Sequence, residues 1–290
     1  MISSMVRFTH PDRVIDAKSG ATKRDLADYY LAVAERMMPH VANRPLSLLR
    51  CPSGANETCF FQKHAIPGMP PSIARSRAGD DDVVAIDSVD GLETLVQFGV
   101  VEVHPWGSHL GRTVEEPDLL VFDLDPDEAL PFSRVADAAL YVRDGLKTLG
   151  LESFLKTTGG KGLHVCVPIV PEMDWEPAKD CTKLVAETLA SARGAKFVST
   201  VSKRARVGKI FVDYLRNGRG ATSIAPYSAR AREGLTVALP IAWRDVHHVA
   251  PRDFDIRSVP AIVAKRRDPW AKMESTRQHL PHASKHARAS

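Results

Sequence analysis

The amino-acid sequence predicts an α+β fold, on the basis of three observations. Short apolar runs typical of strands mix with longer amphipathic runs typical of helices, without the regular alternation of a doubly wound parallel sheet. No internal repeat is visible. The 290 residues, 44% hydrophobic and 26% charged, have the composition of a globular protein with two modest domains or one large core.

The composition also excludes several classes of protein. The hydrophobic content is too high for an intrinsically disordered chain. No apolar run approaches the length of a membrane span, so no membrane partner is expected, and residues 1–5 lack the organisation of a signal peptide. The four cysteines form no CxxC pair: Cys51, Cys59, Cys166 and Cys181. Neither a structural zinc site nor a disulfide framework is therefore expected, and a reducing cytoplasm is the default compartment.

The first half of the chain is expected to combine helices with short strands. Residues 22–38 should form a helix whose first turn is capped by Thr22 and Asp25. Residues 72–82 mix arginines with three consecutive aspartates and are expected to be a surface loop. The other expected elements are strands over 46–50, 58–62 and 100–103 and a helix over 90–98.

The second half contains the strongest strand prediction, over residues 119–124. This apolar run ends in Asp-Leu-Asp-Pro, and the proline halts the pairing of a sheet. Ser133 is expected to cap a helix whose buried side extends to Leu149. The remaining expected elements are strands over 153–156, 163–168 and 210–213 and a helix over 175–192.

Basic residues concentrate late in a chain whose net charge is only +4. Between Ser202 and Gly220 a single acid, Asp213, stands among six cations: Lys203, Arg204, Arg206, Lys209, Arg216 and Arg219. This arrangement favours a site for a polyanion together with a metal over a solvated basic face. Residues 271–290 are expected to be a flexible basic tail, for which a solvated, frayed end and a functional contact are equally good interpretations.

Asp123 and Asp125 stand two residues apart at the end of the expected strand, so both carboxylates project from one face. Two like charges so close are neutralised well by a hard divalent cation, Mg²⁺ or Mn²⁺. Asp213 closes another apolar strand and would complete a two-metal site if the two strands are adjacent. The alternatives are a solvated acidic turn for the pair, and an ion pair with Lys209 or Arg216 for Asp213.

Residues 156–164 read Lys-Thr-Thr-Gly-Gly-Lys-Gly-Leu-His. The glycines let the backbone turn tightly, so that its N–H groups can converge on an anion. Thr158 adds a hydroxyl, Lys161 a positive charge and His164 an imidazole, which makes a triphosphate site and a simple hairpin turn equally good interpretations. The Walker spacing GxxxxGK[ST] is missing, so the segment is not a P-loop.

Single residues elsewhere add weaker signals, and a structural role is the alternative for each. Phe60 and Phe61 end a strand, where one ring is expected in the core and the other could stack on a base. His104 follows an apolar strand and could donate to a phosphate. Arg13 and Lys23 flank the start of the first helix, where cations and helix N–H groups could together bind a terminal phosphate.

In this order, the segments resemble the polymerase domain of bacterial ligase D, which belongs to the archaeo-eukaryotic primase superfamily and serves non-homologous end joining. The resemblance covers about residues 5–270 and rests on many short motifs. They are His10-Pro11-Asp12-Arg13, Thr22-Lys23, Asp28-Tyr29-Tyr30, Arg44-Pro45-Leu46 and residues 60–64, 102–107, 122–126, 156–165, 211–217 and 225–230.

The resemblance implies a fold of mixed and antiparallel sheets flanked by helices, over residues 1–270, with the active site between two sub-regions. It implies metal binding and catalysis by Asp123, Asp125 and Asp213. It assigns nucleotide binding to Phe61, with Phe60 as a possible second ring, and to His104, Thr158, Gly159, Gly160, Lys161, His164, Arg206 and Arg230. It assigns the 5′-phosphate of DNA to Arg13 and Lys23.

The implied activity is the transfer of ribo- or deoxynucleotides to DNA 3′ ends during gap filling and end joining. Two Mn²⁺ or Mg²⁺ ions are the implied cofactors, and NTP or dNTP is the substrate. The implied partners are gapped, nicked or broken DNA with a 5′-phosphate, Ku and a DNA ligase, in the nucleoid-associated cytoplasm. Thr158 replaces a serine and Arg13 a lysine that are frequent in the family, and no ligase or phosphoesterase module is recognisable.

Three alternative functions remain open at the level of sequence. A haloacid-dehalogenase-type phosphatase also places DxD after an apolar strand, but it requires Thr or Val where Asp127 stands. A two-metal nuclease would use the carboxylates and leave the glycine-rich segment unexplained. A non-catalytic DNA-end-binding module would retain the basic surface, but it would have no need for three aspartates.

Overall fold

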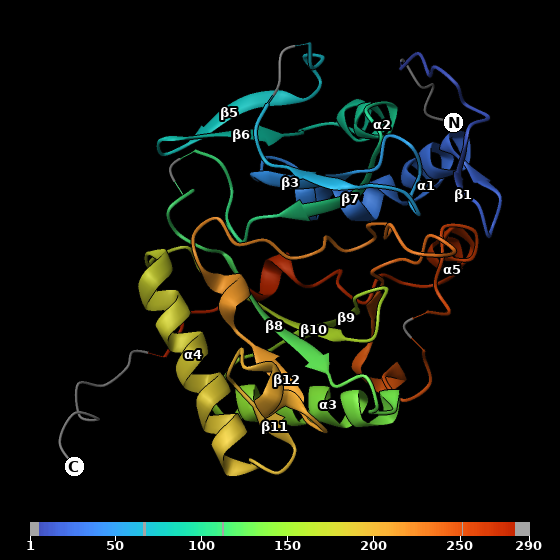
Figure 1. Ribbon diagram of the computed structural model, residues 1–290. Coiled ribbons are helices and arrows are strands. Elements are labelled where there is room, and N and C mark those ends of the chain that lie inside the picture. Colours follow the sequence, from blue (N-terminus) through green and yellow to red (C-terminus); the bar gives the residue numbers. More distant parts are fainter. Residues whose placement is uncertain (1–5, 66–67, 112, 251, 282–290) are drawn as a thin grey trace.

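The computed structural model describes residues 6–65, 68–111, 113–250 and 252–281. Over these residues a five-stranded and a six-stranded sheet lie one above the other (Figure 1). The six-stranded sheet has the order β11 (Phe197–Val198), β12 (Ile210–Asp213), β8 (Leu119–Pro126), β10 (Leu163–Pro168), β9 (Phe154–Thr157) and β13 (Pro240–Ile241). The five-stranded sheet contains β4 (Phe60–Gln62), β3 (Leu46–Arg50), β6 (Asp81–Ala85), β5 (Ala74–Ala78) and β7 (Val100–Pro105), which pairs with β3.

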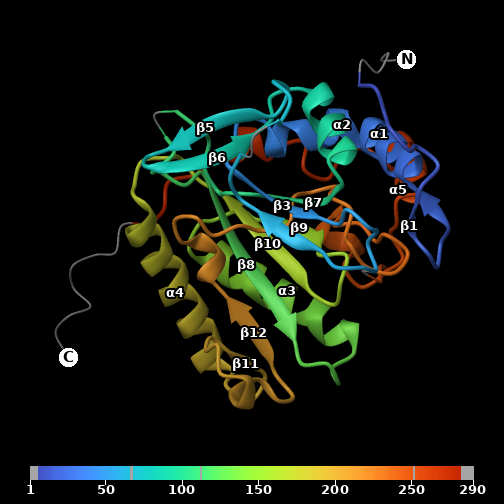
Figure 2. The same cartoon turned by 45° about the horizontal axis from the view of Figure 1, so that its top comes forward.

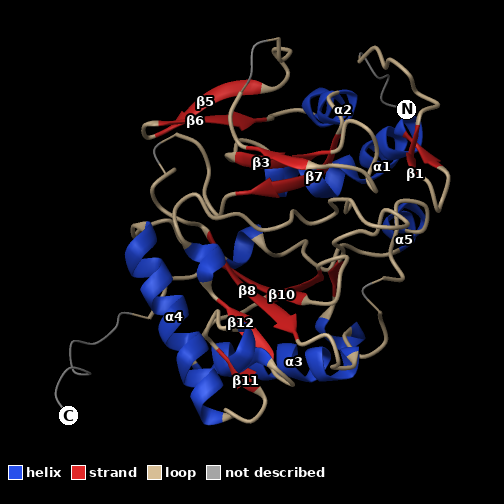
Figure 3. Ribbon diagram, viewed as in Figure 1, coloured by secondary structure: helices blue, strands red, loops and turns tan. Residues whose placement is uncertain are grey.

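Helices and one small ribbon complete the fold, as Figure 3 shows. The ribbon pairs β1 (Val14–Asp16) with β2 (Ala21–Thr22). The helices are α1 (Lys23–Val41), α2 (Val89–Gln97), α3 (Phe132–Thr148), α4 (Trp175–Ala192) and α5 (Val259–Lys265). Both large sheets are antiparallel apart from the β11–β12 pair, which is parallel. The predicted α+β class with mixed and antiparallel sheets is therefore confirmed.

The alternation of side chains along β8 determines which of its residues lie on each face of the six-stranded sheet. α3 and α4 cover one face of this sheet (Figures 1 and 2), and the apolar residues Leu120, Phe122 and Leu124 are buried in the core that includes α3. Because successive side chains of a strand point to opposite faces, Asp123 and Asp125 project toward the five-stranded sheet. The two acids therefore lie between the two sheets, where a cleft can form.

The start of α1 follows the local sequence closely. Thr22 accepts a hydrogen bond from the backbone N–H of Asp25 at 3.2 Å, and Asp25 accepts one from the N–H of Thr22 at 2.8 Å. This reciprocal capping box satisfies two N–H groups that the helix itself leaves free. It confirms the predicted cap, and it places Lys23 at the first position of the helix.

Two predicted elements are wrong. Residues 72–82 are not a surface loop, because most of them form the β5–β6 hairpin at the edge of the five-stranded sheet. An exposed edge carries charges instead of an apolar alternation, which is why the sequence pattern resembled a loop. α3 begins at Phe132 after Pro131, so Ser133 lies within its first turn and caps nothing, and Leu149 at its other end is 44% exposed.

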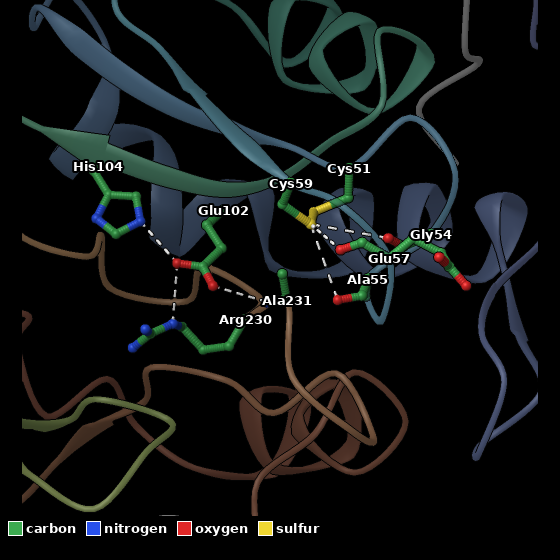
Figure 4. The surroundings of a disulfide bond; sticks show 9 residues. All are labelled: Cys51, Gly54, Ala55, Glu57, Cys59, Glu102, His104, Arg230 and Ala231. Carbon is green, nitrogen blue, oxygen red and sulfur yellow. Dashed lines mark hydrogen bonds and ion pairs between the residues drawn. A yellow bond between two sulfur atoms is a disulfide. The ribbon is translucent and has the colours of Figure 1, made fainter.

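A disulfide joins Cys51 and Cys59, so the expectation that the chain lacks one is wrong (Figure 4). The expectation rested on the missing CxxC spacing, whereas the pairing of β3 with β4 brings the cysteines together. Arg50 pairs with Phe60 at the last register position of that hairpin. The next residue on one strand and the preceding residue on the other are the two cysteines. Cys166 and Cys181 are free.

Removal of the disulfide should lower stability, because the bond closes the loop between β3 and β4. The loop-closure argument gives a loss of roughly 2–3 kcal/mol in the free energy of unfolding for Cys51→Ser/Cys59→Ser. Denaturant melts of the oxidised protein should show this loss, and melts in dithiothreitol should bring the wild type to the level of the variant. Cys181→Ser, at a free and partly exposed thiol, is the matched control and should change neither melt. Identical melts of the double variant and the oxidised wild type would contradict the prediction.

Part of the expected flexible tail is folded. Met273 and Leu280 are buried, and the backbone of Gln278 exchanges hydrogen bonds with the strand end near Pro168 and Val170. Residues 271–281 therefore pack against the body, because their apolar side chains close the space beside β10. Residues 282–290, with Lys285 and Arg288, lie outside the described residues. Within the described ranges, no helix has the length and apolar character required to cross a bilayer.

Candidate active site

Three strands bring the predicted catalytic residues into one row. Asp213 at the end of β12 pairs directly with Asp123 on β8, and Asp123 pairs on its other side with His164 on β10. The imidazole Nε2 of His164 lies 3.4 Å from Asp123 Oδ1. Asp125 follows two residues later on the same face of β8. The adjacency of the two aspartate-bearing strands, which the sequence left open, is therefore present.

The carboxylates differ in their electrostatic environment. Burial and the charge of Asp123 both raise the pKa of Asp125 and of Asp213. Burial also raises the pKa of Asp123, but the nearby His164 and Arg216 outweigh it and lower that pKa to about 2. The charge of Asp123 is therefore the best stabilised of the three, and it disfavours charge on its two neighbours. A cation beside the three carboxylates would relieve this repulsion.

Two arginine side chains lie against these acids. Arg216 Nε is 3.4 Å from Asp123 Oδ2 and 3.8 Å from Asp213 Oδ2. Arg206, whose guanidinium lies over the Phe211 ring, is 3.3 Å from Asp125 Oδ2. Arg216 was considered only as an alternative partner of Asp213, and its role as a bridge between two strands was missed. The available signal was its position three residues after Asp213, on the short helical turn that follows β12.

The donor set fits a hard divalent cation, although the side chains are not gathered around one point. Within the described residues, no three or more His, Cys, Asp and Glu side chains form a ready metal-binding group. The oxygen ligands from adjacent strands are of the type that Mg²⁺ and Mn²⁺ prefer. Burial, and then the charge of Asp123, raise the pKa of Asp125 and of Asp213, and a bound cation would offset both effects.

The glycine-rich segment forms the β9–β10 turn beside Asp123 and Asp125. Gly162 lies close to the backbone of Leu124, the residue between the two acids, and a Cβ at Gly162 would lie 2.6 Å from the Leu124 carbonyl oxygen. Gly159 has φ +67°, which favours glycine, and a Cβ there would lie 2.7 Å from the Arg230 side chain. The absence of side chains at both positions allows this turn to approach β8 and Arg230.

A cleft of about 820 Å³ opens between the sheets at this point. Its lining includes nine of the predicted site residues: Phe61, His104, Asp123, Asp125, Thr158, Gly160, Lys161, His164 and Arg230. Asp213 and Gly159 adjoin the lining through Asp123 and Arg230, and Arg206 reaches the cleft through its contact with Asp125. The glycine turn, Asp123, Asp125 and the Phe61 ring therefore line one cleft.

The two phenylalanines of β4 are both exposed, so the expectation that one ring lies in the core is wrong. Phe61 is 55% exposed, and its ring meets His104 edge to face with centroids 5.3 Å apart. Phe60 is 46% exposed and lies under the guanidinium of Arg50 at 5.5 Å. β4 is an edge strand of the five-stranded sheet, and both of its rings lie outside the core.

A buried lysine was missed by sequence reasoning. Lys156 lies on β9 directly opposite His164, and it is only 1% exposed. Its ammonium makes no hydrogen bond with any described residue, and burial, the largest cause, lowers its pKa to about 8. The sequence did contain a signal, namely a lysine that follows apolar residues within a short strand. A lysine that is buried in such a strand usually has a structural or functional role. Lys156 adds positive charge behind the carboxylate row.

A separate surface pocket contains the two cations expected to hold a 5′-phosphate. This pocket, of about 360 Å³, is lined by Arg13 and Lys23 together with His10 and Arg50, which were not predicted. The ammonium of Lys23 donates to the Thr9 carbonyl oxygen at 3.0 Å. Burial and then the charge of Arg13 lower the pKa of Lys23. Like charges held together in this way favour an anionic ligand.

A second cavity of about 580 Å³ adjoins the cleft and shares Arg216, Ser223 and Ile224 with it, and Lys156 lines this second cavity. Three charged residues of its lining form a cluster around Asp118. Asp118 lies 2.7 Å from Arg44 and 2.6 Å from the ring nitrogen Nδ1 of His109. These contacts outweigh burial and lower the pKa of Asp118 to about 2. The carboxylate of this cluster is therefore paired with cations of the same cavity, so the cluster serves as a comparison for the acids of the cleft.

The chain matches several known proteins over most of its length. A family model described as the primase-polymerase domain of LigD matches residues 22–270. The multifunctional non-homologous end joining protein LigD of Pseudomonas aeruginosa is 39% identical over 282 residues, which are 95% of this chain and 34% of that protein. The LigD protein of Mycobacterium tuberculosis is 36% identical over 279 residues, 91% of this chain and 36% of that protein. The chain thus spans about a third of the length of these curated relatives.

A solved structure provides the same assignment at the level of the fold. The polymerase domain from Mycobacterium tuberculosis ligase D, in complex with DNA, matches with a TM-score of 0.88 and 34% sequence identity. The match covers 96% of this chain and all of that one. The agreement of sequence, fold and strand-end acids leads to one assignment. This chain belongs to the LigD primase-polymerase family.

Proposed function

We propose that this chain is a nucleotidyltransferase that adds nucleotides to DNA 3′ ends at gaps, nicks and breaks during end joining. One observation supports the proposal: Asp123 and Asp125 line a single cleft together with Lys161 and His164 of the glycine-rich segment, and Asp213 on the adjacent strand pairs with Asp123 at its edge. Carboxylates for metal ions and an anion-binding turn for a triphosphate are the two parts that phosphoryl transfer requires. Membership of the LigD family argues against a haloacid-dehalogenase-type phosphatase.

Asp123, Asp125 and Asp213 would hold the divalent ions, two Mn²⁺ or Mg²⁺. When bound, such ions favour ionisation of the primer 3′-hydroxyl and neutralise charge on the phosphates. Arg216 and Arg206 balance the same carboxylates in the present arrangement, so they would move toward the phosphates once a cation takes their place. Before the substrate binds, the two arginines would keep the carboxylates ionised. Once the metal ions are bound, the same arginines would supply positive charge to the phosphates.

The glycine turn and its neighbours would hold the triphosphate of an NTP or dNTP. Thr158 and Lys161 belong to the turn, His104 lies on β7, and Arg230 contacts the turn through Thr158 and β7 through Glu102. Negative charge that develops on the departing pyrophosphate would be met by these groups, which are already in place and need little reorganisation. The exposed ring of Phe61 would stack on a base, a contact worth roughly 1–3 kcal/mol.

The pocket with Arg13 and Lys23 would recognise the 5′-phosphate on the far side of a gap. Arg50 would join them, since it lines the same pocket and its guanidinium lies over Phe60. A phosphate bound here would fix the position of the DNA end relative to the cleft. The chain spans about a third of its curated relatives, so we propose Ku and a DNA ligase as its partners. We propose the nucleoid-associated cytoplasm as its place of action.

Extension of a gapped duplex by the purified chain tests the proposal. Addition of nucleotides in Mn²⁺ or Mg²⁺, and its loss in EDTA, are the expected results. Parallel reactions with NTPs and dNTPs, and with each metal, establish the preferred substrate and ion. Tight DNA binding without extension would instead support the non-catalytic DNA-end-binding module. Cleavage of the DNA without extension would support a nuclease.

Lys23→Ala should weaken the preference for a 5′-phosphate over a 5′-hydroxyl at the gap by about tenfold, the usual loss for a hydrogen bond to a charged group. The measurement is the ratio of the two dissociation constants for otherwise identical gapped duplexes. Lys18→Ala is the control, because Lys18 lies on the nearby β1–β2 ribbon and pairs with Glu233 at the surface. Equal losses on both duplexes would show that Lys23 is a general phosphate contact.

A further inference from the structure

A buried glutamate connects two of the proposed triphosphate ligands. Glu102 lies on β7, is 3% exposed, and places its carboxylate between His104 and Arg230 (Figure 4). Its Oε2 is 2.8 Å from His104 Nε2 and 3.1 Å from Arg230 Nε. The contact with Arg230 is an ion pair without hydrogen-bond alignment, whereas the contact with His104 is a hydrogen bond.

The same carboxylate also holds the backbone that carries Arg230. Its Oε1 accepts a hydrogen bond from the N–H of Ala231 at 2.8 Å. Glu102 and His104 belong to the five-stranded sheet, whereas the other guanidinium edge of Arg230 donates to the carbonyl oxygen of Thr158 in the glycine turn. A continuous chain of contacts therefore runs from β7 through Glu102 and Arg230 to the turn of the six-stranded sheet.

We propose that Glu102 is a positioning residue, which sets the orientation of His104 and Arg230 for the triphosphate without touching the substrate itself. The proposal rests on the proposed function, since it assigns a role within that same cleft. With His104 Nε2 directed at the carboxylate, only the other ring nitrogen remains for a ligand. With one edge of the Arg230 guanidinium at Glu102 and another at Thr158, the rotation of this long side chain is restricted.

The charge of Glu102 is stable enough for this role. Burial would raise its pKa, but the hydrogen bond from His104 and the charge of Arg230 outweigh burial and lower the pKa to about 2. The carboxylate is therefore ionised at every pH at which the protein would act. Two oriented donors cost less conformational entropy when a ligand binds than two free side chains, so the benefit should appear in substrate binding.

Glu102→Gln provides the test, because the amide keeps the volume and an acceptor for Ala231 but removes the charge between His104 and Arg230. We expect the KM for the nucleoside triphosphate to rise about tenfold or more, and kcat to stay within about threefold. The dissociation constant for 5′-phosphorylated gapped DNA should stay at the wild-type value. In an Arg230→Ala background the same substitution should raise KM at most about threefold, because one of its two partners is already absent.

Asp118→Asn is the matched control. Asp118 is a buried carboxylate that pairs with an arginine and a histidine, as Glu102 does, and a second arginine, Arg277, lies 3.4 Å from it; it lies outside the proposed catalytic cleft. The Asp118→Asn variant should have the wild-type KM for the nucleotide, even if its melting temperature is lower. Should Glu102→Gln fail to fold, Glu102→Asp keeps the charge but withdraws it by one methylene, and a raised KM with unchanged DNA affinity supports the proposal equally.

The outcomes separate this inference from the proposed function. Failure of the wild type to extend DNA would overturn the proposed function, and the inference with it. A wild type that extends DNA, beside a Glu102→Gln or Glu102→Asp variant with wild-type KM, would overturn the inference alone. Equal weakening of nucleotide and DNA binding, or the same rise in KM for Asp118→Asn, would reduce Glu102 to a structural residue and also overturn it.

Discussion

Asp123→Asn should slow nucleotide addition by about a thousandfold or more, which corresponds to about 4 kcal/mol of transition-state stabilisation. Asp123 stands at the centre of the row, paired with Asp213 on one side and His164 on the other. The substitution keeps the shape of the side chain and the pairing of β8, but it removes the carboxylate whose pKa, unlike those of Asp125 and Asp213, is lowered. Single-turnover extension of a gapped duplex, at saturating metal and nucleotide, measures the loss.

The substitution should slow the chemical step of nucleotide addition without weakening the binding of DNA. The pocket with Arg13 and Lys23 does not share lining residues with the cleft, so binding of 5′-phosphorylated DNA should stay near the wild-type value. Asp127→Asn is the matched control, because Asp127 follows the same strand and its side chain accepts a hydrogen bond from the nearby backbone N–H of Ala129. It should extend DNA normally. Extension at the wild-type rate by Asp123→Asn or Asp213→Asn would refute the assignment of the metal site.

Local features of the fold were predictable from the sequence because their causes are local. The capping box of Thr22 and Asp25 needs only three residues of spacing, and α1 begins where that spacing places it. The apolar run of β8 and the proline that ends it likewise lie within one short segment. The direction of the Asp123 and Asp125 side chains then follows from the two-residue period of a strand.

The remaining features depend on which strands become neighbours. Asp213 lies beside Asp123 only because β12 pairs with β8, and no local pattern states that pairing. The same applies to Glu102, whose position in the sequence shows its proximity to His104 but not to Arg230. Conversely, the β5–β6 hairpin lacks an apolar alternation because it lies at a solvated edge, so its sequence pattern pointed to the wrong element.

Gly162→Ala should reduce kcat/KM for the nucleotide by about a hundredfold, the size of effect that a displacement of about 1 Å in a catalytic site can produce. A Cβ at this position would lie 2.6 Å from the Leu124 carbonyl oxygen, which is backbone and cannot rotate away. The turn would have to move away from β8, and Leu124 lies between the two acids that a triphosphate would face in the proposed function. The size of the loss in kcat/KM therefore indicates how strongly the reaction depends on the close approach of the glycine turn to the carboxylates.

Gly160→Ala supplies the comparison within the same turn. Its Cβ would meet only the Arg232 guanidinium and the Thr158 hydroxyl, each at 3.4 Å, and both belong to side chains that can adjust. The backbone N–H of residue 160 stays in place, so a loss of only a few-fold is expected. If the glycines served chain flexibility alone, both substitutions would cost a similar factor. A much larger loss at Gly162 than at Gly160 would show that catalysis depends on the close approach of the turn to β8, and equal losses would remove that dependence.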